Sequence, residues 1–145
     1  MLSRQINQKI AVSVVYVAAL FMTIMDSTIV NVALPTLGNE FHVETAAVNG
    51  VVIYYLVALA ATIPISGWLG DKLGGRRVLL GAILLFATAS ALCGMAQSLT
   101  QLETFRVLQG IAGGLMTPVG LAMLWRTFPP AERARLQREF GVAII

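Results

Sequence analysis

The sequence predicts an all-α, polytopic membrane protein. Of its 145 residues, 57% are hydrophobic and 12% are charged, and the mean hydropathy is +0.80. Water-soluble domains carry roughly 25% charged residues, so most of this surface is expected to face lipid. The hydrophobic residues fall into four long segments with few charges. We therefore expect four transmembrane helices, followed by the start of a fifth.

The four segments are residues 10–34, 46–69, 78–97 and 101–125. A helix needs about 20 apolar residues to cross the hydrocarbon core, and each segment is long enough. Backbone groups in lipid must bond to one another, which leaves helices or a closed barrel. Barrel strands alternate polar and apolar residues, whereas the third segment reads AILLFATASALCGMA. A cleaved signal peptide is the alternative for the first segment, but its length and the three later spans favour a retained helix.

The lysines and arginines indicate the orientation of the helices. Nine of the ten cations lie in residues 1–9, 70–77 and 126–139, whereas the gaps at 35–45 and 98–100 contain none. The positive-inside rule makes the cation-bearing gaps cytoplasmic. We expect a protein of the inner membrane with its N-terminus in the cytoplasm and its two cation-free gaps outside.

The last part of the sequence predicts a short surface helix and then a new span. Pro129 and Pro130 end any continuous helix, and several arginines follow them. Residues 126–139 are therefore expected to lie on the cytoplasmic surface. Residues 140–145 resume an apolar run and are expected to be the truncated beginning of a fifth helix.

Two opposite charges interrupt the spans. Asp26 lies about 12 Å before the end of the first span and Arg106 about 9 Å into the fourth, at about 1.5 Å per residue. Each isolated charge at the bilayer centre costs about 2.5–3.5 kcal/mol, so such residues usually face a watery cavity or a partner. We expect the two to share one cavity. Alternatively, Arg106 pairs with Glu103 one turn earlier, and Asp26 caps local backbone together with Ser27 and Thr28.

Small residues in the fourth span predict close helix packing. Gly110 and Gly114 have the small-xxx-small spacing and Gly113 lies beside them, so the backbone of another helix can approach that face. Pro64 and Pro118 are expected to allow kinks within spans two and four.

The gap between spans two and three, GWLGDKLGGRR, places Asp71 among glycines and cations. It lacks both the GxGxxG order and a Lys followed by Ser or Thr, which excludes the usual nucleotide-binding loops. The Asp71 carboxylate is suited to accept charge-assisted hydrogen bonds. The alternative is a plain glycine-rich turn.

Few residues offer other chemistry. Cys93 is the one cysteine and cannot form an internal disulfide, and His42 has no second ligand-type residue at metal spacing. No metal or other cofactor is expected. No Ser/His/Asp, Cys/His or paired-carboxylate arrangement forms a credible active site, so an enzyme is not expected.

Three motifs resemble those of the major facilitator superfamily, and they cover nearly the whole chain in the right order. The loop GWLGDKLGGRR is similar to the motif between helices two and three of that family, although Gly75 and Lys72 depart from it. LETFRVLQGIAGG is similar to the fourth-helix antiporter motif, and MDSTIVNVALP resembles the first-helix motif of the 14-helix drug:proton antiporters, the EmrB/QacA group. In the loop motif the matching residues are Gly67, Asp71, Gly74 and Arg76. In the fourth-helix motif they are Arg106, Gln109, Gly110 and Gly113. In the first-helix motif they are Asp26, Thr28, Asn31 and Pro35.

The resemblance implies the N-terminal part of a multidrug efflux transporter driven by the proton gradient. It implies that Asp26, Arg106, Asn31 and Gln109 belong to the proton-coupling and substrate cavity. It further implies that the loop residues Gly67, Asp71, Gly74 and Arg76 stabilise one access state through contacts with the other half of the transporter. The expected partners are lipid, hydrophobic or cationic drugs and the remainder of the transporter chain, with no nucleic acid.

Two other functions compete with this interpretation. One is a complete four-helix drug transporter that works as a homodimer, which the chain length and Asp26 suit. The other is a membrane assembly protein that transports nothing, for which Asp26 would be dispensable. The loop and fourth-helix motifs favour the antiporter segment, which is expected to be inactive alone because alternating access needs two halves.

Overall fold

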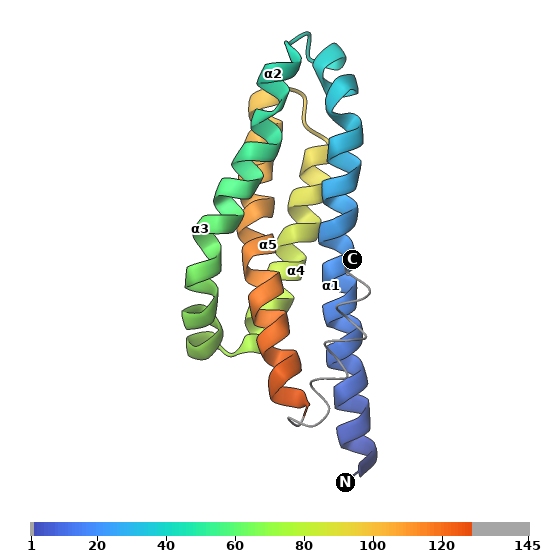
Figure 1. The fold of residues 1–145 in the computed structure, drawn as a ribbon, viewed down its shortest axis with the longest axis vertical. Helices are drawn as coiled ribbons and strands as arrows, with labels where there is room; N and C mark the ends of the chain where they lie inside the picture. The colour runs from blue at the N-terminus through green and yellow to red at the C-terminus, as the bar shows by residue number, and fades with distance from the viewer. Residues whose placement is uncertain (1, 129–145) are drawn as a thin grey trace.

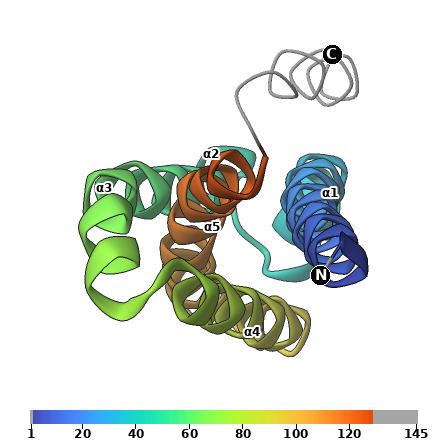
Figure 2. The same ribbon diagram turned by 90° about the horizontal axis from the view of Figure 1, so that it is seen from below.

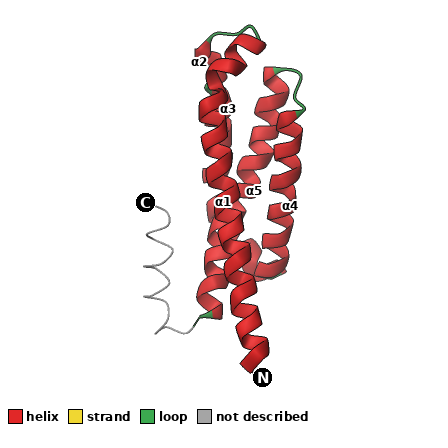
Figure 3. Cartoon of the chain, turned by 90° about the vertical axis from the view of Figure 1, so that its right-hand side faces the viewer, coloured by secondary structure: helices red, strands yellow, loops and turns green. Residues whose placement is uncertain are grey.

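The computed structural model describes residues 2–128, in which every regular element is a helix (Figures 1 and 3). The all-α prediction is confirmed. The predicted surface helix within 126–139 and the predicted start of a fifth helix at 140–145 fall almost entirely outside the described residues. The elements are α1 (Leu2–Glu40), α2 (Thr45–Val48), α3 (Gly50–Leu73), α4 (Gly75–Gly94) and α5 (Leu99–Thr127).

Within residues 2–128, four helices are long and apolar enough to cross a membrane. They run alternately up and down (Figure 1), and α5 lies between α1, α3 and α4 when the bundle is seen from one end (Figure 2). Large apolar side chains such as Val57, Leu84 and Trp68 remain exposed on the bundle. An outer surface of this kind suits lipid. The spans are Lys9–Glu40, Ala46–Leu73, Gly75–Gly94 and Leu99–Thr127.

The charges separate along the length of the bundle. The start of α1, the turn between α3 and α4 and the end of α5 lie at one end (Figure 1). That end carries Lys9 and Arg126 together with the cations of the turn. Glu40, Glu44 and Glu103 lie toward the opposite end, where α1 ends and α5 begins. This distribution follows from the order of the helices, and the cytoplasmic placement of the cationic end stays a prediction.

The first helix is longer than the span expected from the sequence. We expected the span to end at Leu34, before Pro35, but α1 continues to Glu40. Proline lacks a backbone donor and can kink a helix, but Pro35 lies inside α1 without ending it. The helix ends at Glu40, and two residues later His42 has a φ of 53°, in the left-handed region. The Val43 N–H donates to the Gly38 carbonyl at 3.0 Å, so the end of α1 has the bond pattern of a Schellman motif.

The turn between α3 and α4 is shorter than the predicted gap of residues 70–77. Only Gly74 separates the two helices, and its φ of 87° is a conformation that favours glycine. The predicted loop motif is therefore mostly helical. Asp71 lies in the last turn of α3, and Arg76 lies in the first turn of α4.

The start of α5 is fixed by two side chains. The Ser98 hydroxyl accepts a hydrogen bond from the Gln101 N–H at 3.3 Å, and the Gln101 side-chain oxygen accepts one from the Gln97 N–H at 3.0 Å. Together they satisfy backbone donors that the helix leaves free at its N-terminus. This cap sets where Arg106 falls, two turns later along α5.

The glycines of α5 allow α3 to approach its backbone. A methyl group placed at Gly110 would overlap the Tyr55 carbonyl oxygen, and one at Gly114 would lie 2.7 Å from the Leu59 carbonyl oxygen. At Gly113 the nearest atom would be the Tyr55 hydroxyl at 3.1 Å. Small residues at this spacing permit van der Waals packing between helices in lipid. These contacts hold α5 against α3 at the depth of Arg106.

Gly110→Ala is expected to destabilise the bundle by about 1–3 kcal/mol, as overpacking does when backbone atoms cannot move away. Gly81→Ala is the matched control, because a methyl group there meets nothing within 4 Å. Both substitutions raise the helix propensity by the same amount, so the difference between their unfolding midpoints reports the packing at Gly110. The measurement is the thermal unfolding midpoint of the chain in detergent, and equal midpoints for the two variants would contradict the close approach.

Candidate functional site

An ion pair inside the bundle joins the first long helix to the last. The Arg106 Nη1 group donates to Asp26 Oδ2 at 2.6 Å, and the two side chains are 5% and 10% exposed, respectively. The residues are 80 positions apart in the sequence. The similar depths that the sequence indicates for Asp26 and Arg106 therefore agree with the direct contact between them. A buried pair of this kind is sensitive to the loss of either partner, because the remaining charge is left unpaired.

Gln109 holds the second oxygen of the same carboxylate. Its Nε2 group donates to Asp26 Oδ1 at 2.7 Å, and the residue is 0% exposed. Arg106 and Gln109 are three residues apart on α5, a spacing that places both on one helix face. Asp26 therefore accepts a hydrogen bond at each oxygen from the same neighbouring helix.

Helices α3 and α4 also reach this cluster. The Cys93 thiol on α4 lies 3.6 Å from the Gln109 Oε1 atom, and the guanidinium carbon of Arg106 lies 5.8 Å from the centre of the Tyr55 ring on α3. The buried Arg106 Nε has no hydrogen-bond partner among the described residues. All four long helices thus contribute a side chain, and we call Asp26, Arg106, Gln109, Cys93 and Tyr55 the polar cluster.

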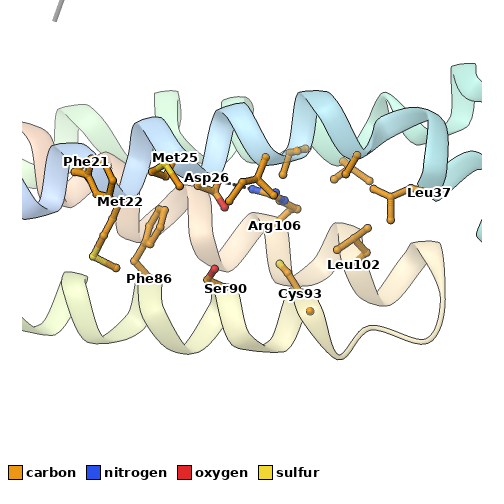
Figure 4. Close-up of a pocket in the computed structure, with 15 residues that line it drawn as sticks. Phe21, Met22, Met25, Asp26, Leu37, Phe86, Ser90, Cys93, Leu102 and Arg106 are labelled. Carbon is orange, nitrogen blue, oxygen red and sulfur yellow. Dashed lines mark hydrogen bonds and ion pairs between the residues drawn. The ribbon is translucent and has the colours of Figure 1, made fainter.

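A cavity of about 470 Å³ borders the polar cluster between α1, α4 and α5 (Figure 4). Its wall is largely apolar, and Asp26 and Arg106 are its charged members. Figure 4 shows Asp26 and Arg106 between α1 and α4, in the middle of the row of lining side chains. The apolar part of the wall includes Phe21, Met22, Met25, Phe86, Leu37 and Leu102.

Asp26 and Arg106 do not bond to the local partners that the sequence also allowed. The Ser27 hydroxyl donates to the Thr23 carbonyl and the Thr28 hydroxyl to the Ile24 carbonyl, so neither bonds Asp26. Arg106 pairs across the bundle rather than with Glu103 in its own helix. The local interpretation of both charges is therefore wrong for the described structure.

Asn31 is the candidate residue that the structure does not bring to the cluster. It lies on α1 with an exposed side chain and is not among the residues that line the cavity. It lies five positions after Asp26, which at 3.6 residues per turn places it on a different side of the helix. Its expected role in the cavity has no support from this arrangement.

The loop residues form a second site at the cationic end. The Arg126 Nη2 group donates to Asp71 Oδ1 at 2.9 Å, and both side chains are 71% exposed. A smaller cavity of about 160 Å³ beside this pair is lined by Gly67 and Gly70 of α3. Arg76 instead lines a pocket between α1 and α4 with Ala11 and Val12 among its other walls. Of the loop residues predicted from the sequence, Gly67 and Asp71 line this smaller cavity together, and Gly74 forms the turn between α3 and α4.

Three residues of these sites were not expected from the sequence. Cys93 and Tyr55 lie in apolar runs, where nothing in the sequence indicates which side of the helix faces the cluster. Arg126 was counted among the cations that set the orientation, and its pairing with Asp71 spans 55 positions. The sequence does place Arg126 at the end of the fourth span, and that end lies at the same membrane surface as the loop that contains Asp71.

Comparisons with known proteins cover most of the chain. The family model of the Major Facilitator Superfamily matches residues 16–137. Proteins from Salmonella typhimurium, Salmonella typhi and Salmonella paratyphi A share 39% identity with it over 112 residues, which is 77% of this chain and 24% of each relative. Each carries the name "Putative multidrug resistance protein MdtD".

The chain thus spans about a quarter of the length of the curated relatives it matches. The family match includes the helices that carry Asp26, Asp71 and Arg106. It confirms the family resemblance that the three motifs indicated. With four long apolar helices, the chain is part of a multi-pass membrane protein. It belongs to the major facilitator superfamily, a family of membrane transporters and not of enzymes.

Proposed function

We propose that this chain is the N-terminal part of a proton-coupled multidrug efflux transporter of the EmrB/QacA type. The observation that carries the proposal is the buried carboxylate of Asp26, which Arg106 and Gln109 hold at the wall of an apolar cavity. Ionisable residues inside a membrane bundle generally mark a substrate or proton pathway. The names of the Salmonella relatives support efflux of drugs as the use of that pathway.

The geometry suits a carboxylate that exchanges one proton. As an anion, Asp26 accepts hydrogen bonds from Arg106 and Gln109. A proton on Asp26 neutralises the carboxylate and removes most of its attraction for the guanidinium, because the strength of the contact depends on both charges. Protonation therefore weakens the contact between α1 and α5. A change in the packing of these two helices would connect proton uptake to the opening of the cavity.

The cavity wall favours substrates with an apolar body. Two phenylalanines and two methionines lie among its aliphatic side chains, and methionine adapts to ligands of different shape. The carboxylate adds an attraction for a positive charge once it is released from Arg106. Hydrophobic or cationic drugs are the substrates we propose. Transport requires the remainder of the transporter, since alternating access is a movement of two halves about a site between them.

We assign the cationic end to the cytoplasm of a cell with an inner membrane, by the positive-inside rule. There the exposed Asp71–Arg126 pair contributes about 0–1 kcal/mol, as surface ion pairs do. So weak a contact can be exchanged for another at little cost. We propose that it helps to stabilise one access state, in which Asp71 and its neighbours Gly67 and Gly74 contact the other half of the transporter.

A double-mutant cycle tests the coupling of the buried pair. In a transporter that contains this segment, Asp26→Asn and Arg106→Gln are each expected to abolish most drug-dependent proton exchange, and the double variant is expected to lose little more than either single one. The reason is that both act through one contact. The measurement is drug efflux together with proton movement in membrane vesicles.

Glu103→Gln is the control for this cycle, since Glu103 is an acid on α5 that lies outside the cavity wall. It is expected to leave efflux nearly unchanged. Additive losses in the cycle would argue against a shared cavity. Strong efflux by the 145-residue chain alone would overturn its assignment as one part of a larger transporter and favour a homodimeric four-helix transporter.

A charge exchange tests the Asp71–Arg126 pair. Asp71→Arg and Arg126→Asp are each expected to slow efflux, because each places two like charges at the end of α3 and α5. The double exchange is expected to recover part of the rate, with little change in the unfolding midpoint. Efflux rates at low and at high salt measure the effect. A double variant no better than the poorer single one would show that the contact has no part in transport.

A further inference from the structure

We infer that Cys93 on α4 is a positioning residue, which pairs with whichever end of the Gln109 amide faces away from Asp26. The inference rests on the proposed function in one respect, namely that Asp26 gains and loses a proton during transport. Cys93 binds no ligand in this role. It acts on Asp26 through Gln109, from a third helix.

Both ends of the Gln109 amide are engaged. Its Nε2 group lies 2.7 Å from Asp26 Oδ1 on α1, and its Oε1 atom lies 3.6 Å from the Cys93 Sγ atom on α4. Gln109 is 0% exposed, so solvent outside the bundle does not compete for either end. The amide therefore bridges α1 and α4 from its position on α5.

The orientation of the amide depends on the charge of Asp26. An ionised carboxylate only accepts hydrogen bonds, so it requires the NH₂ end of the amide. The carbonyl end then faces the thiol, which donates its S–H. This is the arrangement observed.

A proton on Asp26 reverses the requirement. Arg106 still donates to Oδ2, which leaves Oδ1 as the oxygen that receives the proton. The resulting hydroxyl donates, so the amide turns by about half a rotation and presents its carbonyl to Asp26. The NH₂ end then faces the Cys93 sulfur, which also accepts hydrogen bonds weakly. No bond is made or broken except the one between the proton and Oδ1.

A thiol suits both orientations because it donates in one and accepts in the other. An alanine at this position would do neither, and one end of a fully buried amide would lose its partner, which is costly. A serine hydroxyl would do both. Among the described residues, the charged and titratable groups around Gln109 are Asp26 on α1, Arg106 on α5 and the Cys93 thiol on α4, with Tyr55 of α3 beside Arg106.

Thiol labelling of the membrane-inserted chain tests the contact directly. Since the chain has one cysteine, a maleimide reports on Cys93 alone. Gln109→Leu is expected to raise the labelling rate roughly fivefold, the effect of losing about one neutral hydrogen bond, because the freed thiol can turn into the cavity that it borders. Asp26→Asn, which has nearly the same size as the native residue, is also expected to raise the rate. In that variant the turned amide donates to the sulfur and no longer accepts from the S–H, which favours the reactive thiolate.

Thr88→Ala is the matched control on α4, because the Thr88 hydroxyl bonds only carbonyls of its own helix among the described contacts. It is expected to leave the labelling rate unchanged. The Asp26→Asn effect is expected to vanish when Gln109→Leu is already present. Equal labelling rates in the wild-type chain and in the Asp26→Asn variant would overturn the inference.

The pH profile of efflux provides the functional readout in a transporter that contains this segment. Cys93→Ala is expected to shift the pH of half-maximal exchange, because the amide then loses a donor in one orientation and an acceptor in the other and these two losses differ, and Cys93→Ser is expected to restore the wild-type profile. An unchanged profile in Cys93→Ala would overturn the positioning role. If the labelling rates respond as expected but no variant alters proton-driven efflux, the amide contact stands and the proposed function fails.

Discussion

The structure depends on one ion pair that lipid does not screen. Asp26 and Arg106 meet at 2.6 Å inside the bundle, and removing one partner of such a pair generally costs about 3–5 kcal/mol because the other charge stays buried. The contact also holds α1 in place. Among the four candidate spans of the described residues, the span in α1 has the smallest share of buried residues. A helix that packs loosely elsewhere is therefore held in rotation and in depth by the side chain of Asp26.

The glycines of α5 connect helix packing to this chemistry. Gly110 and Gly113 lie one turn beyond Arg106 and Gln109 on neighbouring faces of the same helix. The backbone of α3 approaches the glycine face so closely that no side chain fits between them. Any movement of α5 along α3 would therefore shift the guanidinium and the amide relative to Asp26. The close packing and the buried ion pair share the same few turns of one helix, which suits the proposed coupling of a conformational change to a proton.

The two ion pairs of the bundle differ in strength because their surroundings differ. Asp71 and Arg126 are 71% exposed, so water and salt screen their attraction. Asp26 and Arg106 are almost entirely enclosed and are strongly attracted as long as both are charged. A weak contact at one end of the bundle can be exchanged readily, whereas the buried contact leaves an unpaired charge when it is broken. This division fits the proposed function, in which surface contacts choose between states and protonation of the carboxylate drives the choice.

Hydropathy and charge alone determined the helical class, the four spans and the matching depth of Asp26 and Arg106, because lipid excludes unpaired backbone and tolerates few charges. The three motifs indicated the family. The sequence could not assign the face of each helix that points inward, since lipid-facing and core-facing residues are equally apolar. For that reason the Gln109–Cys93 contact, the place of Tyr55 and the Asp71–Arg126 pair emerged only in three dimensions, and Asn31 proved to lie on another side of α1. Composition decided that the helices cross a membrane, while their mutual rotation decided which polar groups meet.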